Sequence, residues 1–336
     1  MAGEKAKVIP LHSDPARVAS RAKARATRTA TGSAEEIADV IREFETRRGG
    51  PVEPALGELA QRIAGAADFL RRRITGDYTV DEFGFDPQYN EAVVMPVLRF
   101  FHDTWFRVEV SGVENIPDTG AALIVANHAG TLPFDGAMLS VAVHDHHPRR
   151  RDVRLLAADM LFDMPVVGPM ARKAGHTLAC NVDANRLLAA GELTGVFPEG
   201  FKGIGKNFRD RYKLQRFGRG GFVSAALRTK ATIVPCSIVG SEEIYPMLAD
   251  MKLLARVLGM PYFPITPLFP LAGPVGLVPL PSKWHIAFGA PIETAAFEDG
   301  AADDPMVTFE VTDQVRETIQ QTLFTLLGQR RNTFLG

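Results

Sequence analysis

The stretch at residues 121–136 reads AALIVANHAGTLPFDG and combines the two signals that decide the fold. Its first six residues are an uninterrupted apolar run, which is typical of a strand buried on both faces of a parallel sheet. Gly130 and Pro133 follow within a few residues and indicate a turn. The stretch therefore predicts a buried strand that ends in a turn carrying polar side chains.

Similar short β-rich runs recur along the chain, with helical stretches between several of them. The predicted strands are 122–126, 153–157, 177–180, 195–197, 233–239 and 284–288, and the predicted helices are 136–143, 166–173, 184–190 and 220–228. Alternating strands and helices predict an α/β fold with a mixed, largely parallel sheet flanked by helices. In such sheets ligands bind beyond the carboxyl ends of the strands.

Composition and charge limit the classes of function. The 336 residues are 46% hydrophobic and 23% charged, as in ordinary globular proteins. A net charge of −1 argues against a dedicated nucleic-acid binder. Cys180 and Cys236 lie in apolar runs predicted as strands, which does not indicate a disulfide framework.

The chain is predicted to have three parts: a disordered basic tail at 1–32, a helical N-terminal appendage at 33–85, and a main domain at 86–336 that includes a C-terminal helix. The tail carries a net charge of +5, which suits either a solvated tail or a contact with anionic lipid headgroups. No apolar core follows its basic residues, so a signal peptide is not expected. Within the appendage, a second helix is expected to turn Leu70 inward.

Residues 257–282 contain no charged residue but seven prolines. That many interior prolines exclude a membrane-spanning helix, because each removes a helical hydrogen bond. The prolines at 261, 264, 267 and 270 have the period of a polyproline II helix. Two interpretations are open: the segment packs on the sheet, or it lines an acyl channel or dips into a bilayer interface.

His128 directly follows the first predicted strand, where an imidazole is suited to take a proton from a hydroxyl group. Asp135 is the nearest carboxylate that would orient it. The chain segments GVFPEG and IVGSEE are not the G-x-S-x-G motif of a serine nucleophile, which suggests direct transfer to an acceptor hydroxyl. On the spacing of His128 and Asp135 alone, an ordinary structural turn is the favoured interpretation. The histidines of VHDHHPRRR, 144, 146 and 147, are predicted to lie on a solvated loop rather than at a metal site.

A second polar element follows the strand at 195–197. Phe197, Pro198, Glu199 and Gly200 end that strand, and seven cations come after them: Lys202, Lys206, Arg209, Arg211, Lys213, Arg216 and Arg219. This pattern suits either a solvated basic loop or a site for a polyol that carries phosphate.

Together these elements resemble the glycerolipid (lysophospholipid) acyltransferases, related to acylglycerol-phosphate acyltransferase. The resemblance runs over residues 113–292 in four blocks that stand in the family's order: GVENIPDTGAALIVANHAGTLPFDG, LFDMPVVGPMARKAGHTLACN, GVFPEG and IVPCSIVG. The end of the second block and the run ANRLLAAGELTGVFPEG resemble the branch that includes monoacylglycerol acyltransferase-like and phytyl-ester-synthase-like proteins.

The resemblance implies a fold and a reaction. The fold would be that of a glycerolipid acyltransferase domain, and the reaction would move a fatty acyl group from acyl-CoA or acyl carrier protein to the hydroxyl of a glycerolipid or lysophospholipid. His128 would be the general base and Asp135 its orienting partner. No cofactor and no metal are expected. The implied substrate-binding residues are Asn127, Phe197, Pro198, Glu199, Gly200, Lys202, Lys206 and Arg186. The protein would work in the cytoplasm, peripherally at the inner face of the membrane and against anionic lipid.

Two departures from the family pattern bear on this expectation. The usual H-x-x-x-x-D spacing would place the acid at Pro133, two residues before Asp135. In the second block Asn181 stands where the family often has an arginine for the acceptor's phosphate, with Arg186 five residues on. The second departure leaves room for a neutral alcohol and for a mono- or diacylglycerol or wax-type ester synthase. The first keeps open a catalytically decayed lipid-binding protein.

Overall fold

The computed structural model describes residues 53–218 and 220–334, which divide into two units between Thr79 and Val80. The predicted basic tail and the first helix of the appendage lie outside the described residues. The first unit contains α2 (Glu53–Thr75). Leu70 on this helix is 58% exposed, so the expectation that it turns inward was wrong. The second unit is considered by itself below.

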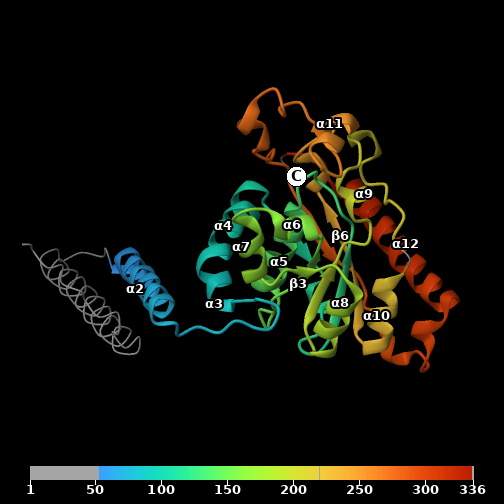
Figure 1. The fold of residues 1–336 in the computed structure, drawn as a ribbon, viewed down its shortest axis with the longest axis horizontal. Coiled ribbons are helices and arrows are strands. Elements are labelled where there is room, and N and C mark those ends of the chain that lie inside the picture. Colours follow the sequence, from blue (N-terminus) through green and yellow to red (C-terminus); the bar gives the residue numbers. More distant parts are fainter. Residues whose placement is uncertain (1–52, 219, 335–336) are drawn as a thin grey trace, which may run out of the picture. The chain divides into compact units, whose positions relative to one another are not determined.

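A seven-stranded sheet forms the centre of the second unit, in the order β1-β9-β6-β2-β5-β3-β4 (Figure 1). Its strands are β1 (Glu109–Ser111), β2 (Ala122–Ala126), β3 (Arg154–Ala157), β4 (Thr177–Leu178), β5 (Leu193–Val196), β6 (Thr232–Val239) and β9 (His285–Phe288). All neighbouring strands are parallel except β6 and β9, which are antiparallel. The predicted mixed, largely parallel α/β fold is confirmed.

Each face of the sheet has its own apolar core, because side chains alternate along every strand. Ala122, Ile124 and Ala126 of β2 face one core, while Leu123 and Val125 face the other. Helices cover both faces (Figure 1). The first core receives α4 (Met95–Arg99) and α5 (Phe134–His146), and the second receives α8 (Asn181–Ala189), α10 (Gly221–Thr229) and α12 (Pro305–Gln329). Since β2 is buried on both faces, its sequence is apolar at every position.

The remaining elements lie around this framework. Before the sheet, α3 (Pro87–Tyr89) leads into α4 and two π-helical stretches, η1 (Asn90–Val94) and η2 (Phe100–Trp105). Shorter helices follow the strands: α6 (Asp159–Asp163), α7 (Val167–Lys173), α9 (Phe201–Ile204) and α11 (Lys252–Val257). A small antiparallel hairpin joins β7 (Ala249–Asp250) to β8 (Pro264–Ile265). Single 3-10 turns are η3 (Val113–Asn115), η4 (Phe208–Asp210), η5 (Ser241–Glu243), η6 (Gly273–Leu277), η7 (Thr294–Ala296) and η8 (Ala301–Asp303).

Two local predictions are corrected. The proline-rich segment forms β8, turns and η6 rather than a polyproline II helix. The histidine cluster is not a solvated loop, because α5 extends to His146 and both His144 and His147 are buried. His144 Nδ1 contacts Asp152 at 3.1 Å. Among the helices that the structure describes, none has the length and apolar character needed to cross a bilayer.

Candidate active site

The turn after β2 accommodates two extra residues between His128 and Asp135, compared with the family's H-x-x-x-x-D spacing. Gly130 and Thr131 both have positive φ angles, of 101° and 64°. Two tight backbone hydrogen bonds follow, from Leu132 N to Gly130 O at 2.6 Å and from Phe134 N to Leu132 O at 2.8 Å. The chain thus folds back on itself twice before α5 begins. Gly130 is required here, since a Cβ would lie 2.6 Å from the carbonyl oxygen of Ser241.

The folded-back turn brings Asp135 to His128. His128 Nδ1 lies 2.7 Å from Asp135 Oδ2, although the two residues are seven positions apart. The carboxylate is fully buried and held in place, because Oδ2 also accepts from Ala129 N and Oδ1 accepts from Gly136 N. A carboxylate in the first turn of a helix is favoured by the helix dipole. The altered spacing therefore does not separate the pair.

The imidazole is oriented with one nitrogen left for chemistry. Because an ionised carboxylate only accepts, Nδ1 carries the hydrogen and Nε2 keeps its lone pair. No hydrogen bond to Nε2 is formed by any residue in the described part of the chain. The ring stacks on Phe197 with centroids 4.6 Å apart, and the side chain is 13% exposed. This is the arrangement of a general base that is open to an acceptor hydroxyl.

The side chain of Glu199 contacts backbone groups of the site and does not face substrate. Its side chain is fully buried; Oε1 accepts from His128 N at 2.9 Å and Oε2 accepts from Gln215 N. Burial raises the pKa of this carboxyl, and the charge of Lys206 opposes that rise. The expectation that Glu199 holds the acceptor is not what the geometry shows: both carboxylate oxygens accept from backbone N–H groups, and one of them fixes the backbone of His128.

Lys206 completes a buried ion cluster with Glu199 and Glu242. Its Nζ lies 3.1 Å from Glu242 Oε1 and 3.8 Å from Glu199 Oε2, and the three side chains are 4%, 6% and 0% exposed. Glu242 Oε1 also accepts from Tyr212 N at 2.8 Å. The structure thus commits Lys206 to two internal carboxylates, which corrects the expectation that it meets a substrate phosphate.

Burial raises the pKa of Glu242 to about 7 against the charge of Lys206. Because the folded pKa exceeds the unfolded value near 4.5, the folded protein retains a proton that the unfolded chain loses as pH rises. This group therefore stabilises the fold fully below pH ~4.5, and its contribution is lost as pH rises through about 7.

We expect Glu242→Gln to remove this pH dependence. Between pH 5 and pH 8, the free energy of unfolding of the wild type should fall by about 3 kcal/mol more than that of the variant. Urea denaturation at both pH values measures the difference, with the exposed Glu298→Gln as the control. Parallel pH dependence in Glu242→Gln and wild type would contradict the assignment.

The other predicted substrate residues are placed unequally. Asn127 is buried, and its amide group pairs with the backbone of β6, donating to Ile238 O at 3.0 Å and accepting from Ile238 N at 2.7 Å. Its side chain therefore joins two strands and does not face substrate. Arg186 forms an ion pair with Glu82 at 2.7 Å and stacks over Phe83 at 4.8 Å. The structure therefore does not place Arg186 among the residues that contact His128.

Two further residues predicted to bind substrate lie in the turn after β5. Pro198 accepts from Gly218 N at 3.2 Å, and Gly200 donates to Phe197 O at 3.0 Å, so both shape the turn after β5. Lys202 on α9 is exposed. Of the sequence-predicted residues, Asp135, Phe197 and Glu199 each contact His128 directly.

Sequence reasoning missed Gly203, Glu242 and Tyr262. The hydroxyl of Tyr262 donates to Thr131 O in the turn after β2. Gly203 allows α9 to lie against the histidine: a Cβ there would be 2.5 Å from His128 O and 2.9 Å from His128 Cβ. A glycine pair, Gly203 and Gly205, after the FPEG motif was the available signal, but its meaning depends on which backbone lies opposite.

Gly203→Ala should move α9 and the His128 backbone apart and lower kcat by about 10²-fold, because small displacements of a catalytic group are costly. Steady-state kinetics on the folded variant, checked by circular dichroism, measures this. Gly328→Ala on α12 is the matched control, since no atom lies within 4 Å of the added Cβ. Equal kcat for the two variants would show that the close approach is unimportant.

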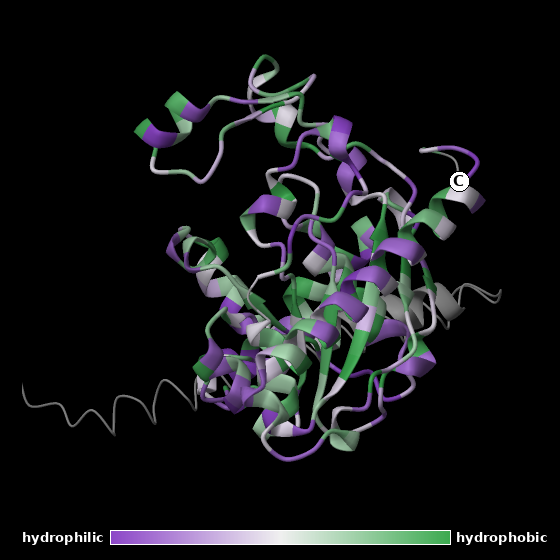
Figure 2. Cartoon of the chain, turned by 90° about the vertical axis from the view of Figure 1, so that its right-hand side faces the viewer, coloured by the Kyte–Doolittle hydropathy of each residue, from purple (hydrophilic) through white to green (hydrophobic). Residues whose placement is uncertain are grey.

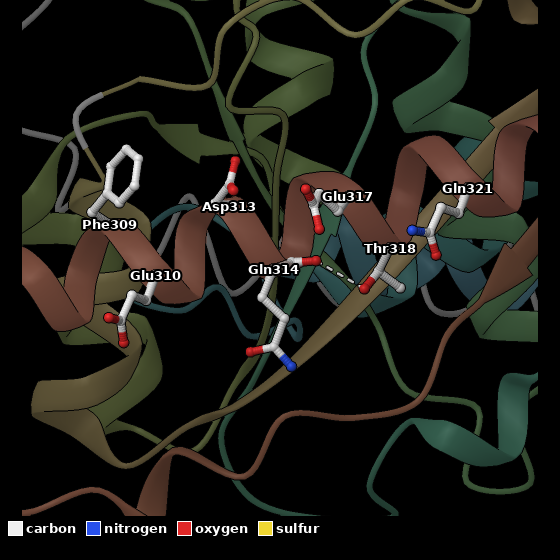
Figure 3. Close-up of a pocket in the computed structure, with 7 residues that line it drawn as sticks. All are labelled: Phe309, Glu310, Asp313, Gln314, Glu317, Thr318 and Gln321. Atoms are coloured by element: carbon white, nitrogen blue, oxygen red, sulfur yellow. Dashed lines mark hydrogen bonds between the residues drawn. The ribbon is translucent and has the colours of Figure 1, made fainter.

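Hollows elsewhere on the second unit differ in chemistry. One of about 330 Å³ lies along α12 and is lined by residues of that helix alone, including Glu310, Asp313 and Glu317 (Figure 3). Its acidic lining would repel an anionic co-substrate. Another of about 450 Å³ has four cations and one carboxylate in its lining: Arg211, Lys213, Arg330, Arg331 and Glu243. Arg330 is paired with Glu243 at 2.9 Å. No group of side chains suited to hold a metal ion occurs within residues 53–218 and 220–334.

Comparisons with known proteins identify a family match in the region that contains this site. A family model described as Acyltransferase matches residues 107–239, which contain His128, Asp135 and Glu199. An uncharacterized protein of Mycobacterium tuberculosis (strain ATCC 25618 / H37Rv) is 67% identical, over 100% of this chain and 99% of that protein. An uncharacterized protein of Mycobacterium leprae (strain TN) is 65% identical, over 99% and 96% respectively.

Two more distant similarities complete the comparison. A Bos taurus protein, "DGAT1/2-independent enzyme synthesizing storage lipids", is 24% identical over 49% of this chain and 48% of that protein. The crystal structure of the 1-acyl-sn-glycerophosphate (LPA) acyltransferase PlsC from Thermotoga maritima is similar with a TM-score of 0.49 and 20% identity, over 73% of this chain and 84% of that one. The match to the family model, which contains His128, Asp135 and Glu199, shows that this chain belongs to the acyltransferase family.

Proposed function

We propose that the protein transfers a fatty acyl group from an acyl thioester to the hydroxyl of a glycerolipid, with His128 as general base. The carrying observation is the closed His128–Asp135 pair, 2.7 Å apart, with Nε2 unengaged. A decayed site is the poorer explanation, because the chain folds back twice to keep this contact despite the longer spacing. The buried cluster behind Glu199 further fixes the histidine.

The chemistry follows from this geometry. Nε2 of His128 takes the proton from the acceptor hydroxyl as its oxygen attacks the thioester carbonyl. Asp135 stabilises the imidazolium that forms. As the carbon–sulfur bond breaks, the imidazolium returns the proton to the leaving thiolate, so a lipid ester and a free thiol result.

The charges favour an acceptor with a neutral headgroup. Lys206 is consumed by Glu242 and Glu199, and Arg186 is paired with Glu82. Neither is available for an acceptor phosphate. The distant relative named as an enzyme synthesizing storage lipids supports the same direction. We therefore favour mono- or diacylglycerol over lysophosphatidate, at the inner face of a membrane.

The test is a panel of acceptors with acyl-CoA: lysophosphatidate, monoacylglycerol, diacylglycerol and a long-chain alcohol. Thiol release that depends on a neutral acceptor is expected. Release with lysophosphatidate alone would contradict the preference for a neutral headgroup, and no release with any acceptor would contradict the proposed function.

The hollow lined by Arg211 and Lys213 suits the phosphates of coenzyme A. Arg211→Glu combined with Lys213→Glu should raise KM for acyl-CoA about tenfold, because two attractive charges become repulsive. KM for the corresponding acyl-pantetheine, which lacks those phosphates, should stay unchanged. An equal rise in KM for both donors, or no rise for either, would show that the hollow does not bind the phosphates of the donor.

A further inference from the structure

Exposed large apolar side chains are concentrated along one continuous segment of the second unit. Between residues 248 and 278 eleven of them are at least 39% exposed: Leu248, Met251, Leu253, Val257, Leu258, Met260, Leu268, Leu271, Val275, Leu277 and Val278. Leu271 is 92% exposed. Soluble monomers rarely expose so much apolar surface in one place without a partner for it.

This apolar segment lies beyond the carboxyl ends of the central strands, at the same end of the sheet as His128. It follows β6, while Leu132 follows β2 and Phe201 follows β5, and these two side chains are also exposed. The three strands are parallel neighbours, so their carboxyl ends meet at one edge. The segment is orange in Figure 1 and projects beyond the ends of the strands. It lies at the top of Figure 2 as well.

The base of the apolar segment is fixed while its apolar side chains face outward. Tyr262 donates to Thr131 O in the turn after β2, and Leu280 N donates to Ile244 O at 2.9 Å. The hairpin of β7 and β8 is closed by hydrogen bonds from Leu248 N to Ile265 O and from Met251 N to Phe263 O. The exposed side chains therefore belong to a built surface that is attached to the active site.

The charges near this surface indicate its partner. No charged residue occurs from 257 to 282, whereas Lys252 and Arg256 on α11, within the segment, and Lys202 on α9 are exposed. The acidic residue of the segment, Asp250, is half-buried and accepts from Phe263 N. Phe208 N donates to Met247 O at 2.8 Å, which places the basic segment after α9 against the start of the apolar one. Apolar side chains with cations at their margin match a bilayer that has anionic headgroups above its acyl chains.

We propose that the apolar segment 248–278, together with Leu132 and Phe201, docks the protein on an anionic lipid bilayer. The proposal builds on the proposed function, because a glycerolipid acceptor resides in such a bilayer. Docking by this surface would present the edge of the sheet that carries His128 to the lipid.

The experiment compares two double variants of the full chain by flotation with vesicles of equimolar phosphatidylcholine and phosphatidylglycerol. Leu253→Glu with Leu271→Glu places charges on side chains that are 75% and 92% exposed. Its affinity for the vesicles should fall by about tenfold or more. Met306→Glu with Phe309→Glu on α12, at 65% and 66% exposure, is the matched control and should bind like wild type.

Three results would overturn the proposal: no binding of the wild type to these vesicles, equal binding by Leu253→Glu/Leu271→Glu, or a wild-type dimer in sedimentation that this variant abolishes. The third result would assign the surface to a second copy of the chain. His128→Ala should bind vesicles like wild type, so docking is measured independently of acyl transfer. Vesicle binding without any acyl transfer would contradict only the proposed function.

Discussion

Replacing His128 with alanine is expected to lower kcat for acyl transfer by about 10²–10⁴-fold, the usual contribution of a positioned general base. The imidazole has one nitrogen on Asp135 and the other unengaged, so no other group in the pair can take the acceptor's proton. KM values for donor and acceptor should change little, since the lost interaction is made chiefly in the transition state. Initial rates at saturating acyl-CoA measure the effect.

The matched control is His146→Ala, which removes an exposed histidine at the end of α5. Its kcat should equal that of wild type. If His128→Ala turned over as fast as His146→Ala, the proposed mechanism would be wrong.

Replacing Lys206 with methionine should lower the free energy of unfolding by about 3–5 kcal/mol, because it leaves two buried carboxylates without their cation. Glu199 and Glu242 are almost completely inaccessible to water, so solvent cannot take over the role of the ammonium group. Urea denaturation at pH 8 measures the loss. The matched control is Lys202→Met on the exposed side of α9, for which little change is expected.

A second variant separates lost charge from lost packing. Lys206→Met combined with Glu242→Gln should recover part of the stability, because one unpaired carboxylate is removed as well. If the single and double variants are equally stable, or if Lys206→Met matches Lys202→Met, the ion cluster does not stabilise the fold.

The central strands of the sheet can be predicted well from the sequence, whereas the edge strand β1 cannot. The strand at 122–126 is predicted to the residue, because burial on both faces leaves an apolar run that ends at a polar turn. The edge strand β1 was not predicted: its three residues are only half-buried or exposed, and β9, some 170 positions later, supplies its partner. Likewise, the run of α- and π-helix at 87–105 lacks a regular apolar period.

For the site, the residue types were predictable but the directions of their side chains were not. Asn127 and Glu199 follow strands, where a polar side chain can face either a ligand or the backbone of a neighbouring segment. Both face backbone, of Ile238 in one case and of His128 and Gln215 in the other. The closure of Asp135 onto His128 likewise depends on two positive φ angles that the letters alone do not determine.

We propose that His128 drives transfer of an acyl group to a lipid hydroxyl. The most direct test follows both products of one reaction, using acyl-CoA labelled in its acyl chain and monoacylglycerol in vesicles. The account predicts labelled diacylglycerol and free thiol in equal amounts from wild type, and neither above background from His128→Ala. Thiol released without labelled ester, or ester formed equally by His128→Ala, would contradict it.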